Sequence, residues 1–157
     1  MPHRSHAHSH SLSHQLQEAE KICAARKERL TPQRREVYLL LLQEGRPLKA
    51  YDLLRRLSTK TRAVKPPTVY RALDFLLKMG LVHRVEALDA FLACLHQHPH
   101  HSSQLLVCGQ CGDVRELHGK LFDEAVQKLA KSASFTPSAS TVEIQGCCAA
   151  CREGAHV

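Results

Sequence analysis

Hydrophobic positions in the first half of the chain recur every three or four residues, which is the period of an amphipathic α-helix. This pattern predicts four consecutive helices, over residues 15–30, 31–44, 50–57 and 66–79. Thr31 and Pro32 are typical of the N-cap and first turn of a helix, while Gly45 and Gly80 are placed to end two of them. Cys23 lies on the apolar side of the first helix and is expected to be a core residue.

After Gly80 the apolar runs become shorter and are bounded by turn residues, as expected for β-strands. Strands are predicted over residues 81–85, 90–94, 104–107, 113–117 and 140–145. A turn at residues 87–89 separates the first two, which therefore predict a β-hairpin. A last helix is predicted over residues 120–131, and the apolar side that we expect it to bury consists of Leu121, Phe122, Ala125, Val126 and Leu129.

These elements predict an α+β protein. Three short helices followed by a fourth with a polar face describe a helix-turn-helix arrangement, and the hairpin behind it would be the wing of a winged helix. We divide the chain into a disordered His-rich tail (1–14), a winged-helix domain (15–94), a hinge linker (95–103) and a small α/β domain (104–157). The tail is either a solvated segment or a loose metal-collecting arm, since imidazole is a common metal ligand.

Composition narrows the class of protein. The chain has 157 residues, enough for one or two domains, and 43% hydrophobic with only 4% aromatic residues suits a helical protein better than a β-sandwich. A net charge of +7 favours a polyanionic partner such as DNA. Because no apolar run approaches the ~20 residues of a membrane span and the N-terminus lacks a signal-like stretch, we expect a soluble, cytoplasmic protein without a membrane partner.

Two Cys-x-x-Cys pairs carry the strongest chemical signal. The pairs are Cys108 with Cys111 and Cys148 with Cys151, and seven cysteines in a cytoplasmic protein are expected to be reduced. Four thiolates in two such pairs are typical of a structural zinc site. The alternative is a redox dithiol, which shares the spacing of either pair alone.

The fourth helix carries candidate DNA contacts on its polar side. Tyr70 and Arg71, in its first turns, could place a phenol and a guanidinium on a groove floor. The helix N-terminal amides and Thr68 could approach phosphates. The alternative is the ordinary solvated face that any amphipathic helix has.

Several motifs resemble the ferric uptake regulator family. Residues 29–34 (Arg-Leu-Thr-Pro-Gln-Arg), residues 65–74 and the paired Cys-x-x-Cys motifs follow the order of that family. Residues 21–24, 50–54 and 148–151 are similar more narrowly to its zinc-sensing branch, and the similarity runs from about residue 15 to residue 151. The resemblance implies a homodimeric, metal-activated repressor with an N-terminal winged helix and a C-terminal α/β dimerisation domain.

The resemblance also implies two zinc ions per subunit. The four cysteines would hold the structural ion, although Cys147 is an extra thiol that could substitute for Cys148. The regulatory ion would be held by His83, Cys94, His101 and Glu116. One thiolate, two imidazoles and one carboxylate suit Zn²⁺ better than iron or manganese. These ligands come from both sides of the linker, so a bound ion would fix the relative angle of the two domains.

We assign the DNA-binding residues by their chemistry, and one of them by the resemblance. Arg71 is expected to read a base, and Tyr70 to make apolar contact with a base edge. Tyr51 matches a family position that reaches DNA. Phosphate contacts are assigned to Lys65, Thr68 and Arg34. The expected target is an AT-rich inverted repeat bound by a homodimer, with one or two dimers per operator.

The function implied is that of a zinc-responsive DNA-binding regulator, chiefly a repressor of zinc-uptake genes. Alternatives are an iron or peroxide sensor of the same fold and a zinc buffer or chaperone that does not bind DNA. An enzyme is not expected, because no catalytic template fits. The zinc deaminase pattern, for example, needs His-x-Glu and a Pro before Cys-x-x-Cys, whereas His83 is followed by Arg84, Val85 and Glu86.

Overall fold

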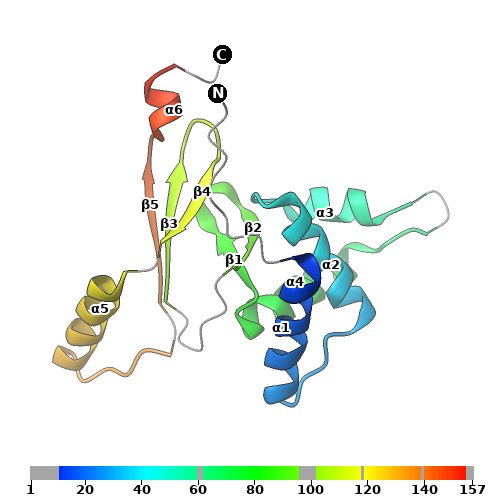
Figure 1. Ribbon diagram of the computed structural model, residues 1–157, viewed down its shortest axis with the longest axis horizontal. Helices are drawn as coiled ribbons and strands as arrows, with labels where there is room; N and C mark the ends of the chain where they lie inside the picture. The colour runs from blue at the N-terminus through cyan, green and yellow to red at the C-terminus, as the bar shows by residue number, and fades with distance from the viewer. Residues whose placement is uncertain (1–10, 60–61, 96–101, 118, 139, 155–157) are drawn as a thin grey trace.

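The computed structural model describes residues 11–59, 62–95, 102–117, 119–138 and 140–154. Four helices gather on one side, a three-stranded sheet lies on the other, and a two-stranded hairpin lies between them (Figure 1). The four helices are α1 (Leu12–Ala25), α2 (Pro32–Glu44), α3 (Ala50–Leu57) and α4 (Pro66–Met79). Among the described residues, no helix combines the length and the apolar character needed to cross a membrane.

The ends of α2 and α4 confirm the boundary residues read from the sequence. Both helices begin with proline and end at a left-handed glycine, Gly45 at φ 60° and Gly80 at φ 72°. Helix α1 differs from the prediction: it starts at Leu12 and ends at Ala25, because Lys27 adopts φ 56° and turns the chain away before residue 30. Thr31 occupies the N-cap position of α2 but makes no side-chain capping hydrogen bond.

The helices enclose the larger hydrophobic core. Helix α4 contributes most of one wall, with buried residues Val69, Ala72, Leu73, Phe75, Leu76 and Met79. Cys23 is buried among these helices, as predicted, while Leu54 and Leu77 are only partly buried. Each fully buried side chain of this kind stabilises the fold by about 1.5–3 kcal/mol relative to an exposed one. Because the apolar side of α4 packs into this core, its polar side faces the solvent.

The hairpin joins the helices to the sheet. Strands β1 (Val82–Val85) and β2 (Ala90–Ala93) pair antiparallel around the 3₁₀ turn η1 (Glu86–Leu88), so the predicted wing is present. The sheet has the order β4-β3-β5, with β3 (Ser102–Cys108) antiparallel to β4 (Val114–Leu117) and parallel to β5 (Ser140–Gly146). Strand β3 starts at Ser102, two residues before the predicted strand start at residue 104 and inside the predicted linker. Helix α6 (Ala149–Arg152) was not predicted.

The two faces of the sheet differ. Leu105 and Val107 of β3 pack with Val85 and Leu92 of the hairpin in a second, smaller core. On the opposite face Leu117 and Ile144 are exposed. Because alternate residues of a strand point to opposite faces, one face is covered by the wing and the other has no covering element among the described residues.

Helix α5 (Lys120–Ser132) corrects the sequence prediction that its apolar side is buried. The helix has the expected bounds within one residue, but none of its residues is buried, and Leu121 and Leu129 are 84% and 71% exposed. Figure 1 shows why: α5 stands apart from the sheet and from the helical half. The amphipathic pattern predicted a helix correctly, but it could not tell whether the apolar side faces its own chain.

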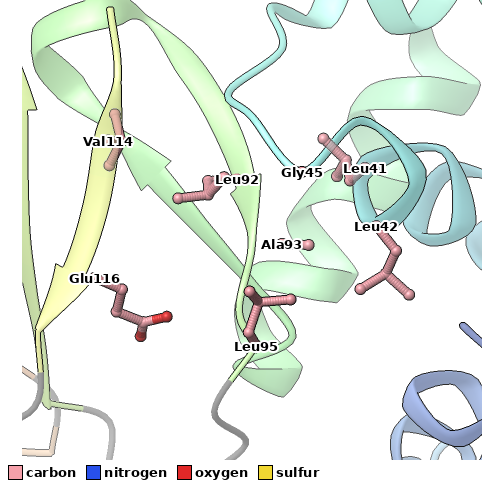
Figure 2. A pocket seen from close by; sticks show the side chains of 8 residues that line it. All are labelled: Leu41, Leu42, Gly45, Leu92, Ala93, Leu95, Val114 and Glu116. Atoms are coloured by element: carbon pink, nitrogen blue, oxygen red, sulfur yellow. The ribbon is translucent and has the colours of Figure 1, made fainter. Parts of the chain in front are cut away.

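A cleft remains where the helical half meets the sheet. Figure 2 shows its wall, made by the end of α2, by β2 and by β4, with lining residues Leu41, Leu42, Gly45, Leu92, Ala93, Leu95, Val114 and Glu116. Seven of these residues carry no charge, whereas Glu116 extends a carboxylate into the same region. The two halves are therefore joined across an incompletely filled junction.

Candidate functional site

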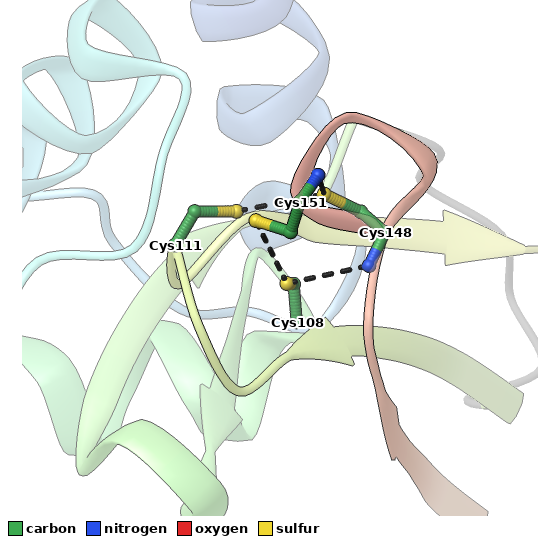
Figure 3. Close-up of side chains that lie close together, drawn as sticks. All are labelled: Cys108, Cys111, Cys148 and Cys151. Atoms are coloured by element: carbon green, nitrogen blue, oxygen red, sulfur yellow. Dashed lines mark hydrogen bonds between the residues drawn. The ribbon is translucent and has the colours of Figure 1, made fainter. Parts of the chain in front are cut away.

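The two Cys-x-x-Cys pairs converge at one end of the sheet (Figure 3). Cys108 ends β3, Cys111 lies in the following turn, and Cys148 and Cys151 flank the start of α6. The Sγ atoms of Cys108 and Cys151 are 3.8 Å apart, as are those of Cys111 and Cys148. All four sulfur atoms lie within 4.8 Å of one another.

These distances fit a zinc ion. Tetrahedral zinc with Zn–S bonds of about 2.3 Å places its sulfur ligands about 3.8 Å apart. The convergence of both pairs is the arrangement of a four-thiolate metal site, whereas a redox dithiol needs only one pair. Cys147 does not belong to this group: its exposed Sγ lies 3.7 Å from the carbonyl oxygen of Cys148.

Backbone N–H groups favour a thiolate at one position of the cluster. Hydrogen bonds from the backbones of Cys111, Cys148 and Gln110 lower the pKa of Cys108 to about 5. Burial, together with hydrogen bonds to neighbouring thiols, raises the pKa of Cys151. The metal-free cluster at neutral pH therefore combines a thiolate with a protonated thiol, so zinc must displace protons when it binds.

A second group of possible ligands lies between the wing and the sheet. His83 Nε2 is 2.9 Å from Glu116 Oε1, and the Cys94 Sγ is 3.6 Å from the same oxygen. The three ligand atoms lie within 4.8 Å of one another. The side chains of His83 and Glu116 are only 12% and 9% exposed, and Cys94 is buried. A buried carboxylate beside an imidazole and a thiol is a donor set that suits zinc.

Strand alternation explains why these side chains meet. His83 and Val85 share one face of β1, and Val85 packs against the sheet. Glu116 shares a face of β4 with Val114, which packs in the same small core. Cys94 directly follows β2, and its N–H donates to the Leu81 carbonyl oxygen. The fourth predicted ligand, His101, lies outside the described residues.

Ser103 is a site residue that the sequence did not single out. It was assigned to the linker, but it lies in β3, is buried, and its Oγ is 3.1 Å from His83 Nδ1. A metal ligand His commonly hydrogen-bonds through its other ring nitrogen, which fixes its tautomer and orientation. If Nε2 binds metal, Nδ1 carries the proton and donates a hydrogen bond to Ser103 Oγ. A polar residue at an inward position of a buried strand is the signal that could have revealed it.

Two of the predicted DNA contacts of α4, Tyr70 and Arg71, lie on its exposed side. Tyr70 is 54% exposed, Arg71 is exposed, and Lys65 immediately precedes the helix. Thr68, in the first turn of the helix, is partly buried on the same side as Ala72. Tyr70 and Arg71 lie on the side opposite the buried stripe, and no element among the described residues covers them.

The other two predicted DNA contacts lie elsewhere on the helical half. Tyr51, in the first turn of α3, is 71% exposed. Arg34 is engaged within the fold: its guanidinium lies 3.5 Å above the centre of the Phe75 ring and donates to the Arg29 carbonyl oxygen at 2.7 Å. This side chain therefore fastens the start of α2 to α4, a structural role that the sequence did not indicate.

Comparisons with known proteins agree with this geometry. Residues 25–145 match the profile of the ferric uptake regulator family. The zinc uptake regulation protein of Escherichia coli is 44% identical over 139 residues, which cover 88% of this chain and 81% of that protein. A zinc uptake regulator solved in complex with zinc and DNA has 40% identity and a TM-score of 0.83, covering 94% of this chain and 99% of the other.

Two structures of one further relative differ in their likeness to this chain. Holo XcZur matches with a TM-score of 0.78 at 40% identity, covering 91% of this chain and 99% of that one. Apo XcZur matches with only 0.52 at 39% identity, covering 90% and 97%. At nearly equal identity, the arrangement described here is closer to the holo form. The family and the relatives consist of regulators rather than enzymes, and the chain belongs to the ferric uptake regulator family.

Proposed function

We propose that this protein is a zinc-responsive, DNA-binding transcriptional regulator, chiefly a repressor of zinc-uptake genes in the cytoplasm. The observation that carries the proposal is the group formed by His83, Cys94 and Glu116. Its members come from the wing and from the sheet, on opposite sides of residues 96–101. A ligand held there would connect the part that reads DNA to the rest of the molecule.

The sensor site follows from this group. We infer that His101 completes it, so that one thiolate, two imidazoles and one carboxylate surround the ion. Zinc, when bound, supplies bonds that join the wing to β4. The thiolate of Cys94 favours zinc over iron, because a sulfur ligand is less natural in an iron site of nitrogen and oxygen donors.

The second ion has a different role in this proposal. Cys108, Cys111, Cys148 and Cys151 would hold a structural zinc, giving two ions per subunit. These cysteines tie β3 to the segment after β5, and no residue of the helical half takes part. This site would stabilise the sheet, whereas the sensor site would regulate DNA binding.

The exposed side of α4 would read the operator. We assign Arg71 to a base, Tyr70 to apolar contact with a base edge, and Lys65 and Thr68 to phosphates. Tyr51 is assigned to the DNA surface as well. The sequence also assigned Arg34 to a phosphate. Because its guanidinium is engaged on Phe75, a phosphate contact there would come from the backbone at the start of α2.

The protein would act as a homodimer on an AT-rich inverted repeat, with one or two dimers per operator. The support is the uncovered apolar surface of the second half, formed by α5 and one face of the sheet. A second copy that covers it would place two α4 helices on successive major grooves, about 34–36 Å apart for half-sites one helical turn apart. Fixing that spacing with zinc would change DNA affinity about 5- to 150-fold, as is typical of allosteric coupling.

A zinc titration of operator binding tests this proposal. Parent protein that retains its structural zinc should bind a promoter fragment with an AT-rich inverted repeat tightly only after zinc is added. Cys94→Ser should lose this response, while Cys147→Ser, a thiol outside both groups, should keep it. Arg71→Ala should weaken binding by about 1–3 kcal/mol and reduce discrimination between operators.

The proposal would be contradicted if the protein bound the promoter fragment equally tightly with its sensor site empty and with that site filled by zinc. Restoration by Fe²⁺ but not by Zn²⁺ would instead favour the iron sensor. High zinc content without any DNA binding would favour the buffer.

A further inference from the structure

A second polar contact joins the wing to the sheet, at the opposite end of the hairpin from the metal ligands. The carboxylate of Glu143 in β5 accepts hydrogen bonds from two consecutive backbone N–H groups of η1. Its Oε1 lies 2.5 Å from the Glu86 nitrogen, and its Oε2 lies 3.0 Å from the Ala87 nitrogen. The partners are 57 and 56 residues apart in the chain, so tertiary structure alone creates this contact.

Strand register explains how a glutamate reaches the wing. Glu143 pairs with Leu105 in the parallel β3–β5 ladder, and Leu105 is fully buried against the hairpin. Paired residues of neighbouring strands point to the same face of a sheet. Val142 and Ile144 therefore point to the outer face, where Ile144 is 51% exposed. Along β5 the charged residue faces the domain junction and the apolar residues face away from it.

The contact satisfies groups that would otherwise lack a partner in the turn. The first N–H groups of a helical turn have no intrahelical acceptor. A carboxylate that accepts two of them makes charge-assisted hydrogen bonds, which are stronger than neutral ones. Glu143 is thus matched to the start of η1 in both charge and geometry.

The location of this contact matters for how the wing is held. His83 and Cys94 lie at the open end of the hairpin, and Glu86 and Ala87 at its turn, about 10 Å further along at ~3.3 Å per residue. The small core between them is flanked by the unfilled cleft of Figure 2. A bond at the open end alone would leave the hairpin able to pivot about that point. A second attachment at the turn removes this freedom.

We propose that Glu143 is a positioning residue of the zinc switch, which anchors the wing turn to β5 so that the ligand group at the open end forms at one fixed angle. This inference rests on the proposed zinc-dependent DNA binding. In the protein without sensor zinc, Glu143 keeps the wing near the sheet and so brings His83 and Cys94 close to Glu116. In the loaded protein it limits the wing to the orientation that suits the operator.

Three variants test this role in the full-length dimeric protein. Glu143→Gln retains the shape but presents an amide N–H to one of the two donors. Glu143→Asp keeps the charge on a shorter arm and should restore part of the effect. Glu124→Gln removes an exposed carboxylate from the polar side of α5 and is the matched control. Zinc content of the four-cysteine site and the far-ultraviolet circular dichroism spectrum establish that each variant is folded.

Three readouts are expected to change together in Glu143→Gln. Amide exchange at Glu86 and Ala87 should accelerate, zinc affinity of the sensor site should fall about tenfold, and operator affinity in saturating zinc should fall by a similar factor. Glu143→Asp should lie between the parent and Glu143→Gln, and Glu124→Gln should match the parent.

Two outcomes would overturn the inference. Faster amide exchange with unchanged zinc and operator affinities would make Glu143 a local cap of the turn and nothing more. Unchanged exchange would mean that the contact does not form in solution. A parent protein that ignores zinc when binding DNA would instead contradict the proposed function, and the amide exchange and zinc affinity of the variants would still decide the role of Glu143.

Discussion

The two halves of this chain are stabilised in different ways. The helical half encloses a core in which Tyr38, Leu41, Leu53 and Leu76 are fully buried. Among the residues that the structure describes, the sheet half has only the small core that it shares with the wing, and α5 buries no residue at all. The helical half therefore has the apolar contacts to maintain its own fold. Besides this core, the sheet half would depend on the proposed zinc at the cysteine cluster and on the proposed second copy.

This difference matches the division of labour in the proposed switch. The winged helix must keep its shape while its orientation changes, so a complete hydrophobic core of its own is an advantage. The half that is proposed to assemble instead leaves the apolar side of α5 uncovered for a partner, and it contributes Glu116 to the proposed sensor site. Four predictions test this comparison.

The largest effect is expected from loss of the structural zinc. Structural zinc sites contribute apparent binding energies on the order of 10–16 kcal/mol, which exceeds the stability of most domains. Cys111→Ser should therefore unfold the sheet half while amides of α1–α4 stay protected in hydrogen exchange. Cys147→Ser is the control, because it removes a neighbouring thiol that is outside the cluster. If the amides of both halves were equally protected from exchange in Cys111→Ser, the sheet half would not depend on the zinc site for its stability.

A matched pair of leucines should separate the two kinds of apolar surface. Leu76 is 0% exposed and Leu129 is 71% exposed. Leu76→Ala should destabilise the helical half by about 2–5 kcal/mol at any protein concentration. Leu129→Ala should leave that half unchanged and raise the dimer dissociation constant, as measured by sedimentation at several concentrations. A Leu129→Ala variant that dimerises as tightly as the parent would mean that α5 is not part of the interface.

Zinc binding at the cysteine cluster should depend steeply on pH. Burial raises the pKa of Cys151, and for Cys111 the backbone N–H of Asp113 lowers the pKa but burial and the Cys108 thiol outweigh it, so that it is raised. At least these two thiols must lose a proton to bind zinc, so near neutral pH the zinc affinity should fall at least about a hundredfold per unit of decreasing pH. Competition titrations at several pH values measure this slope. A pH-independent affinity would contradict these protonation states.

The smallest effect is expected at the contact behind the sensor site. Ser103→Ala removes the hydroxyl near His83 Nδ1 and should weaken sensor zinc about 10- to 100-fold, as mutations of such outer partners do. Co²⁺ placed in the sensor site gives a spectroscopic check. Its visible absorption bands should broaden in the variant, while the four-cysteine site keeps its zinc. Thr136→Ala, at an exposed position between α5 and β5, is the control and should bind zinc as the parent does.

Much of the fold was readable from the sequence because it depends on local interactions. The apolar period and the residues Pro32, Gly45 and Gly80 predicted α2 and α4 within one residue at each end. Helix α1 was misplaced because the left-handed turn at Lys27 carries no glycine to mark it. The wing strands and the paired cysteines were likewise predicted from short-range patterns, since turn residues and ligand spacing act over a few positions.

The candidate sites were only partly readable. The four-cysteine cluster could be proposed from spacing alone, whereas the group of His83, Cys94 and Glu116 required the family resemblance. Ser103 and Glu143 were missed. Both are polar residues on the inward face of a strand, and periodicity does not reveal which face of a sheet is inward. The pattern of β5 even favours the wrong side, because its apolar residues point away from the junction.

By itself, therefore, the sequence determined which segments are helices and strands, and which thiols could share a metal ion, because propensity, capping and ligand spacing act between near neighbours. Only the tertiary structure decided that β5 is parallel to β3, that Glu143 reaches η1, and that α5 stands uncovered. Those features depend on contacts between residues tens of positions apart, and their energy exists only once both partners have been brought together.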